Sequence, residues 1–372
     1  MESGRKDVSA PLMLDRSFWG MTATQFFGAF NDNLFKQLLL ILSVGLVAAD
    51  AGEAKSEDTQ WIAMLLFAAP FLLFSGFAGY LSEKFSKRRV IVLSKVAEIV
   101  VMLLGLVAFL AYESWGMLPL WIVLFLMGAQ SAFFGPGKYG ILPELLREGD
   151  LPRANGVVLM TTFISIIFGT ALAGILKDVF AGRLWIVSAC CVGIALIGTL
   201  TSLLVRRVPP ADPKLAFEPA ALAVPKEMRD TLRRDTPLFH ALLASCMFWL
   251  VGGIVQPAVN ALGKLQLLVG NERADSYTSL LAASVAVGIA GGCLFAGWVS
   301  GSRADFRIMR IGLWGIVLFL LLLAVPHPSA ALAWFGGDAA ASPQPQALGF
   351  GGSCVALLGC GFCTGMFAVP LQ

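Results

Sequence analysis

The chain has 372 residues, of which 57% are hydrophobic and 14% are charged, and its mean hydropathy is +0.78. Soluble domains carry about a quarter of their residues as charged side chains, so this composition excludes an ordinary soluble fold. The net charge is only +3, and Lys and Arg lie between the apolar runs rather than in one stripe, which argues against nucleic-acid binding. We expect an all-α integral membrane protein.

Ten apolar segments approach or exceed the length of about 20 residues that a helix needs to cross a bilayer. In chain order, the predicted spans are Phe18–Val47, Trp61–Leu81, Val90–Tyr112, Leu118–Phe134, Asn155–Leu176, Leu184–Val205, Pro237–Leu262, Ser276–Val299, Ile308–Val325 and Leu348–Gln372. A proline-rich polar stretch separates six spans from four and is predicted to be a linker. The predicted organisation is a cytoplasmic N-terminus (1–17), a six-helix N-terminal half (18–205), a cytoplasmic linker (206–236) and a C-terminal half with four helices (237–372).

The distribution of basic residues predicts the orientation. Lys and Arg cluster after the second span (84–89), after the sixth (206–207) and after the eighth (303–310), and such loops favour the cytoplasm. The loop 50–58 between the first two spans instead carries four acids against a single Lys. A multi-pass protein with a cytoplasmic N-terminus is therefore expected.

Polar residues interrupt the centre of the first span, where Asn31, Asp32, Asn33 and Lys36 follow one another closely. A charged side chain there costs about 2.5–3.5 kcal/mol on insertion, so it should face a polar cavity or a partner. Asp32 and Lys36 are four residues apart and share a helix face with Gln25. We predict a substrate-binding or coupling site, and a structural ion pair that locks helices together is the alternative.

The third span contains a second charged pair, Lys95 and Glu98. We expect Lys95 to extend toward the membrane interface and Glu98 to meet a basic group from a neighbouring helix. A structural and a functional role are both open for this pair.

The stretch Gly79-Tyr-Leu-Ser-Glu-Lys-Phe-Ser-Lys-Arg-Arg89 places an acid and a basic cluster in a tight loop after the second span. It resembles the signature loop of the major facilitator superfamily, although Glu83 stands where Asp is usual and Ser86 where Gly is usual. The resemblance implies that Glu83, Arg88 and Arg89 form a cytoplasmic gate. An ordinary positive-inside loop is the alternative.

Two Pro and three Gly lie in Phe134-Gly-Pro-Gly-Lys-Tyr-Gly-Ile-Leu-Pro-Glu-Leu145, and they predict a helix break around Lys138, Tyr139 and Glu144. Broken helices at membrane depth are tolerated where they line a cavity or are buried in protein. A cationic Lys138 at such a break is a candidate binding group for phosphate or carboxylate, and a plain cytoplasmic hairpin is the alternative.

These segments, together with Phe30-Asn-Asp-Asn-Leu-Phe-Lys36 and Gly365-Met-Phe-Ala-Val-Pro-Leu371, resemble the bacterial lysophospholipid transporter family and the transporter half of fused transporter-acyltransferase proteins. The resemblance implies a major facilitator-type bundle of twelve helices, so we expect a C-terminal truncation of this chain and poor transport by it. By this likeness, Asp32 corresponds to the family's first-helix acid and Lys138 to the Lys of its helix-break motif. Gln256 stands where family members carry an Arg.

The resemblance further implies a secondary transporter of the bacterial cytoplasmic membrane that works by alternating access. Its expected partners are lysophospholipid or another amphipathic small molecule, membrane lipid, and an acyltransferase/acyl-carrier-protein synthetase that re-acylates the cargo. A permease or exporter of another solute on the same scaffold is the first alternative. A membrane enzyme or a non-transporting scaffold are the others.

No reaction, cofactor or metal site is predicted. His240 and His327 are isolated from any nucleophile or carboxylate pattern, and the seven Cys lie in apolar stretches without His or acidic neighbours at ligand spacing. Cys360 and Cys363 form a CxxC, but their Gly-rich apolar surroundings argue against a redox role. The sequence also lacks a phosphate-binding loop for ATP. We therefore do not expect an enzyme.

Overall fold

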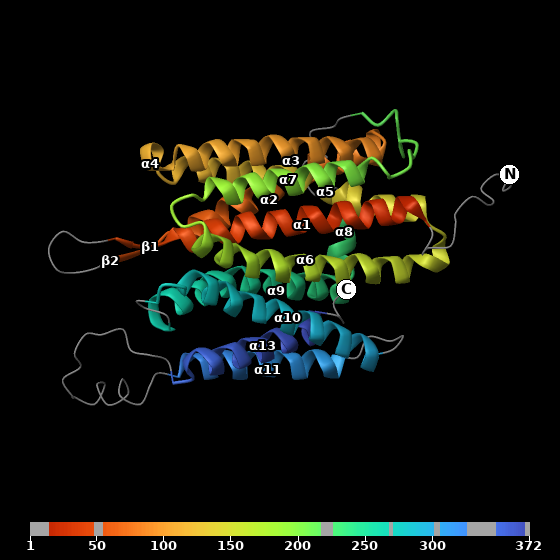
Figure 1. The fold of residues 1–372 in the computed structure, drawn as a ribbon. Helices are drawn as coiled ribbons and strands as arrows, with labels where there is room; N and C mark the ends of the chain where they lie inside the picture. Colours follow the sequence, from red (N-terminus) through yellow and green to blue (C-terminus); the bar gives the residue numbers. More distant parts are fainter. Residues whose placement is uncertain are drawn as a thin grey trace, which may run out of the picture. The chain divides into compact units, whose positions relative to one another are not determined.

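The computed structural model describes residues 15–47, 55–216, 226–267, 271–300, 306–325 and 347–368. Parts of six predictions lie outside these residues: the N-terminus before Asp15, the start of the loop 50–58, the middle of the linker, the start of the basic stretch 303–310, His327 and the end of the tenth span. The elements, drawn in Figure 1, are α1 (Arg16–Ser43), β1 (Val44–Val47), β2 (Lys55–Asp58), α2 (Gln60–Lys84), α3 (Lys87–Leu110), α4 (Tyr112–Trp115), α5 (Leu118–Leu145), the 3-10 helix η2 (Glu148–Asp150), α6 (Leu151–Val179), α7 (Trp185–Ser202), α8 (Lys226–Arg234), α9 (Thr236–Ala261), the π-helix η4 (Leu262–Leu267), α10 (Ala274–Ser300), α11 (Phe306–Ala324) and α13 (Gly349–Ala368).

Long apolar helices make up most of the described chain, which confirms the predicted all-α membrane fold. Nine helices in the described ranges are long and apolar enough to cross a membrane, and they coincide with the second to tenth predicted spans. The first predicted span forms α1, a helix of 28 residues that is not among these nine and carries the polar stretch 31–36 at its centre. The sequence therefore predicted the positions of ten helices correctly.

The first span ends earlier than predicted, because the chain turns from helix to strand after Ser43. β1 pairs antiparallel with β2, with Val44 opposite Asp58. The Thr59 backbone N–H donates to the Ser43 carbonyl oxygen at 3.1 Å, so the hairpin returns the chain to the end of α1. β-branched residues such as Val44 favour a strand once the helix has ended.

The predicted break around Lys138 is wrong, because α5 is continuous from Leu118 to Leu145 with Pro136 and Pro143 inside it. A proline in a membrane helix is tolerated where neighbouring helices hold the segment. α5 has such neighbours on both sides. A Cβ at Gly128 would collide with the Phe67 carbonyl oxygen of α2, and one at Gly137 would lie 3.2 Å from the Ile91 side chain of α3.

The chain divides into two compact units. The first unit contains the described residues of 1–32, 65–165 and 183–228, and the second contains those of 33–64, 166–182 and 229–372. In the first unit, α3 packs against α5 and α7. A buried cluster that includes Phe18, Ile91 and Phe134 joins α1, α3 and α5. The predicted division into an N-terminal and a C-terminal half remains a prediction.

In the second unit, α13 packs against α10 and α11, as Figure 1 shows at the blue end of the chain. Glycines spaced four apart line both sides of the contact with α10: Gly288 and Gly292 on α10, and Gly361 and Gly365 on α13. A Cβ at any of these four positions would collide with the backbone of the facing helix. Small residues at this spacing let membrane helices approach closely, so van der Waals contacts hold the pair together.

Candidate transport site

Asp32, at the centre of α1, is hydrogen-bonded by α5. The Ser131 hydroxyl donates to Asp32 Oδ2 at 2.6 Å, and the Gln130 amide donates to Oδ1 at 3.4 Å. The same amide donates to Ser131 Oγ at 2.8 Å, so the two α5 side chains support each other. These donors offset part of the cost of holding a half-buried carboxylate away from water.

Lys138 is the cation of this site. It lies on α5 seven residues after Ser131, a spacing that returns to the same helix face. Its half-buried side chain is attracted by the charge of Asp32 and repelled by that of Lys95, and its Nζ lies 4.6 Å from the centroid of the Tyr139 ring. The first unit thus contains both Asp32 and Lys138, an anion and a cation that interact electrostatically, and their role in a site stays a prediction.

Asn31 belongs to a neighbouring buried ion pair. Lys95 Nζ lies 2.5 Å from Glu98 Oε2, and the Asn31 amide donates to Glu98 Oε1 at 2.9 Å. Lys95 is 2% exposed and Glu98 is fully buried. The prediction that Lys95 extends to the interface is wrong, because its short helical spacing to Glu98 lets the two charges pair inside the bundle. The basic partner of Glu98 also comes from its own helix rather than a neighbouring one.

Gly28 makes room for this pair, because a Cβ at that position would collide with Lys95 Nζ. The ammonium also lies 4.9 Å from the centroid of the Phe134 ring, a cation–π contact. The pair therefore fixes α1 and α5 against α3.

Asn33 and Lys36, the other predicted members of the first-span site, lie on the part of α1 that belongs to the second unit. Both side chains are half-buried and neither is without a partner.

The loop between α2 and α3 does not join Glu83 to Arg88 or Arg89 in an ion pair. The Glu83 side chain is exposed, and none of the ion pairs among the described residues includes it. Arg88 instead donates to the carbonyl oxygens of Val205 and Leu203, at 2.5 and 3.1 Å. These carbonyls lie just after α7, where backbone acceptors lack helical partners.

An ion pair that the sequence analysis missed lies beside this loop, between Lys87 at the start of α3 and Glu144 at the end of α5. The signal that was available is the position of both residues next to predicted cytoplasmic turns.

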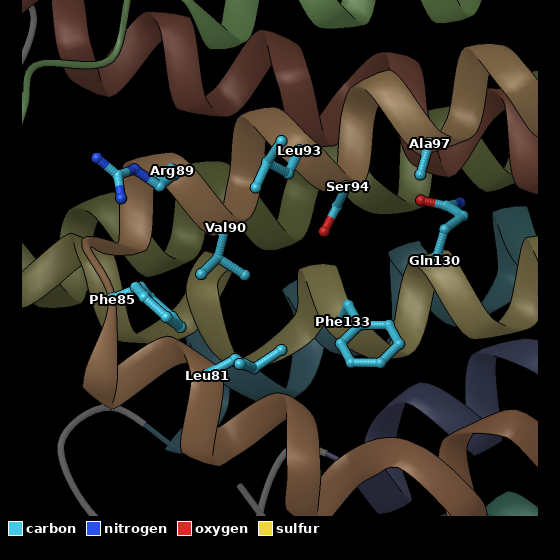
Figure 2. Close-up of a pocket in the computed structure, with 9 residues that line it drawn as sticks. All are labelled: Leu81, Phe85, Arg89, Val90, Leu93, Ser94, Ala97, Gln130 and Phe133. Atoms are coloured by element: carbon cyan, nitrogen blue, oxygen red, sulfur yellow. The ribbon is translucent and has the colours of Figure 1, made fainter. Parts of the chain in front are cut away.

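A groove lies between α2, α3 and α5 in the first unit (Figure 2). Its cavity volume is about 320 Å³. Figure 2 shows Arg89 at one end and Ala97 and Gln130 at the other. The lining residues are Leu81, Phe85, Arg89, Val90, Leu93, Ser94, Ala97, Gln130 and Phe133. Gln130 therefore contributes both to this groove and to the Asp32 site.

The second unit contains a chain of buried amides that connects α1, α2 and α9. Gln256 donates to Gln37 at 3.1 Å, Gln37 donates to Asn260 at 2.8 Å, and Asn260 donates to Gln60 at 2.9 Å. Gln60 in turn donates to the Pro257 carbonyl oxygen at 3.1 Å. Gln37, Gln60 and Asn260 are fully buried. Gln256, a predicted binding residue, is thus one member of a hydrogen-bonded set of neutral groups.

A charged cluster lies near the C-terminal ends of α1 and α6, in η4 and at the start of α10. Asp275, at the start of α10, pairs with Lys177 of α6 and lies 3.0 Å from Lys264 Nζ of η4. Lys264 also donates to the Ile41 carbonyl oxygen of α1 at 3.0 Å, and Asp178 accepts from Ser276. We call these charged residues and the four amides the polar layer. The sequence analysis missed the charged residues of the polar layer. The sequence shows only that they lie at or beyond the ends of predicted spans.

A bundle of apolar helices that buries an opposed charge pair and a polar layer is typical of membrane transporters. The comparison with protein families identifies the chain further. Residues 19–372 match the model of the Major Facilitator Superfamily, and the chain belongs to this superfamily of transporters. It is a multi-pass membrane protein and not an enzyme.

Two of the curated relatives carry the same name. The chain is 27% identical over 333 residues to the "Lysophospholipid transporter LplT" of Serratia proteamaculans, which covers 84% of this chain and 77% of the relative. It is 28% identical over 326 residues to the protein of that name from Yersinia pestis, covering 86% and 74%.

Solved structures share the fold. A bacterial homologue of the human lysosomal transporter Spinster superposes with a TM-score of 0.57 at 14% identity, over 96% of this chain and 75% of that one. A peptide transporter of the POT family gives a TM-score of 0.56 at 14% identity, over 96% and 81%.

Proposed function

We propose that this protein is a secondary transporter that moves lysophospholipid across a bacterial inner membrane toward the cytoplasmic leaflet. The name of the curated relatives supports this cargo class, and so do the Lys138 segment and the Asp32 segment that led to the resemblance. A permease or exporter of another amphipathic solute is the alternative on the same scaffold. Re-acylation of the delivered cargo by a separate acyltransferase/acyl-carrier-protein synthetase completes the proposal.

The observation that carries the mechanism is that the first unit holds two groups of opposite charge, Asp32 and Lys138, which attract each other electrostatically. A zwitterionic headgroup has an ammonium for Asp32 and a phosphate for Lys138, and both protein groups are half-buried, so each gains from a charged ligand. Ser131 and Gln130 hold the carboxylate in place. In this proposal Asn31 and Asn33 are the neighbours of Asp32 along the sequence.

Alternating access requires a barrier at each end of the cargo path, and the polar layer is our candidate for the outer barrier. It links segments before residue 183 to segments after residue 228, so it must separate when the outer side opens. Gln256 contributes to this barrier rather than clamping a phosphate. At the other end of α2 and α3, Glu83, Arg88 and Arg89 are the proposed cytoplasmic gate. A cytoplasmic N-terminus is part of the same proposal.

The test is uptake of labelled lysophosphatidylethanolamine by spheroplasts that express the protein. Asp32→Asn keeps the shape and one of the two acceptor oxygens but removes the charge, so we expect it to lower uptake at least tenfold, which corresponds to about 1.4 kcal/mol of lost binding. Asp212→Asn is the matched control, because Asp212 is exposed in the linker and Asn can still accept from the Lys214 N–H.

Equal uptake by the Asp32→Asn variant and the parent would remove Asp32 from the site. No uptake by the parent, with the protein folded in the membrane, would exclude this cargo and leave the alternative solute.

A further inference from the structure

We propose that the groove between α2, α3 and α5 is a lipid-binding site. It holds one acyl chain of a negatively charged membrane phospholipid, whose phosphate binds Arg89. The site concerns a lipid resident beside the bundle and does not depend on which cargo is transported.

Arg89 differs from the three other basic residues of the α2–α3 loop. Lys84 donates to the Tyr80 hydroxyl at 2.6 Å, Lys87 pairs with Glu144, and Arg88 donates to backbone carbonyls after α7. No hydrogen bond or ion pair joins Arg89 to another of the described residues, and its side chain is exposed at the end of the groove (Figure 2). A guanidinium in this position can bind a phosphate with two parallel hydrogen bonds.

The groove continues from Arg89 along one face of α3. Its α3 residues are 89, 90, 93, 94 and 97, and the eight residue steps from 89 to 97 correspond to a length of about 12 Å along the helix. Apolar side chains from α2 and α5 close the other side, among them Leu81 and Phe133. Leu93 is 60% exposed, so the groove opens to the surroundings of the bundle. In a membrane these surroundings are hydrocarbon, and an acyl chain fills such a groove without loss of hydrogen bonds.

Charge selects the headgroup. Arg89 lies at the end of α3 where Lys84, Lys87 and Arg88 also lie, next to predicted cytoplasmic turns. Basic residues near an anionic leaflet gain about 1 kcal/mol each from its negative charge. A net negative phospholipid is therefore favoured over a zwitterionic one, whose own ammonium would be repelled by this cluster.

The far end of the groove connects the lipid to the transport site. Gln130 lies there beside Ala97, and the same side chain donates to Ser131 and Asp32. An acyl chain in the groove packs against Gln130 and limits its alternative rotamers. Lipid occupancy is thus positioned to affect the hydrogen bonding of Asp32.

The full chain is incubated with phosphatidylglycerol or phosphatidylcholine and purified in mild detergent. Native mass spectrometry then measures the lipid that the protein retains. We expect Arg89→Ala to lower phosphatidylglycerol retention about fivefold, and Ala97→Phe, which fills an exposed position of the groove, to remove it. The matched controls are Arg207→Ala, an exposed Arg at the same end of the bundle, and Val96→Phe, an exposed α3 position outside the groove. Both should retain phosphatidylglycerol as the parent does.

Equal retention by the parent, Arg89→Ala and Ala97→Phe would overturn the site. Loss that is equally large in Val96→Phe would assign the effect to general damage to α3 and also overturn it. Retention of phosphatidylcholine as tight as that of phosphatidylglycerol would contradict the charge selection, and displacement of the lipid by inorganic phosphate alone would contradict the role of the chain.

Discussion

Replacing Lys95 with Met tests whether the buried Lys95–Glu98 pair is structural. The substitution removes the ammonium that lies 2.5 Å from Glu98 and leaves a carboxylate with no exposed surface. The Asn31 amide, 2.9 Å away, then remains as a neutral donor to this charge. Met fills much of the space of the Lys side chain, so the change is mainly one of charge.

The expected cost follows from the loss of one partner of a buried pair, which destabilises proteins by about 3–5 kcal/mol. At about 1.4 kcal/mol for each factor of ten, the folded to unfolded ratio falls by roughly two to four orders of magnitude. The double variant Lys95→Met/Glu98→Gln removes both charges and keeps an acceptor for Asn31. We expect it to recover most of the lost stability.

The assay is equilibrium unfolding in mixed micelles with increasing SDS, which yields the free energy of unfolding, with Val96→Met at an exposed α3 position as the control. A loss below about 1 kcal/mol in Lys95→Met, or a double variant as unstable as the single one, would refute the argument from an unpaired buried charge. If the double variant is stable and transports cargo, the pair is structural. If it is stable and inactive, the pair has a functional role.

Two further predictions concern the second unit. Asp275→Asn removes the charge that Lys177 and Lys264 share, so the polar layer should open more often. Ser279 is buried, and a cysteine placed there as a reporter should react several-fold faster in the Asp275→Asn background with an impermeant maleimide added outside cells. An unchanged reaction rate would contradict the outer-barrier role. Gly361→Ala forces a Cβ into the α10 backbone and should lower the free energy of unfolding by about 1–3 kcal/mol. In Gly351→Ala, on the same helix, the Cβ meets open space, and the free energy of unfolding should rise by about 0.5–1 kcal/mol. Equal effects of the two substitutions would refute the packing argument.

The helices could be predicted from the sequence because a membrane-spanning segment must be both apolar and long, and both properties are local. Ten predicted spans correspond to ten helices, and the α9 boundary was within one residue because Asp235 caps the helix and Pro237 follows it. The α5 interior was predicted wrongly for the opposite reason. Pro136 breaks a helix in isolation, but contacts of Gly128 and Gly137 with neighbouring helices hold α5 together, and such contacts are not local.

The members of the site were easier to predict than their partners. Asp32 and Lys138 stand out because charge in an apolar run is costly, which holds whatever surrounds them. Their partners depend on tertiary packing. The hydrogen bond from Gln37 to Asn260 joins residues 223 positions apart, and Lys177 and Asp275 are 98 apart. Glutamine and asparagine in a membrane span give a weak signal in one sequence, so the polar layer became visible only in the folded chain.

The helix α1 contributes residues to both polar clusters. Asp32 and Gln37 are five residues apart on α1, which has no Gly or Pro between Gly28 and Ser43. Opening the polar layer breaks four amide hydrogen bonds between α9 and the pair α1 and α2, each worth about 0.5–1.5 kcal/mol, or roughly 2–6 kcal/mol in all. A ligand shifts this equilibrium only by its difference in affinity between the closed and open states. In the proposed mechanism, contacts of the cargo at Asp32 and Lys138 must therefore differ by a comparable free energy between the two states to drive the change.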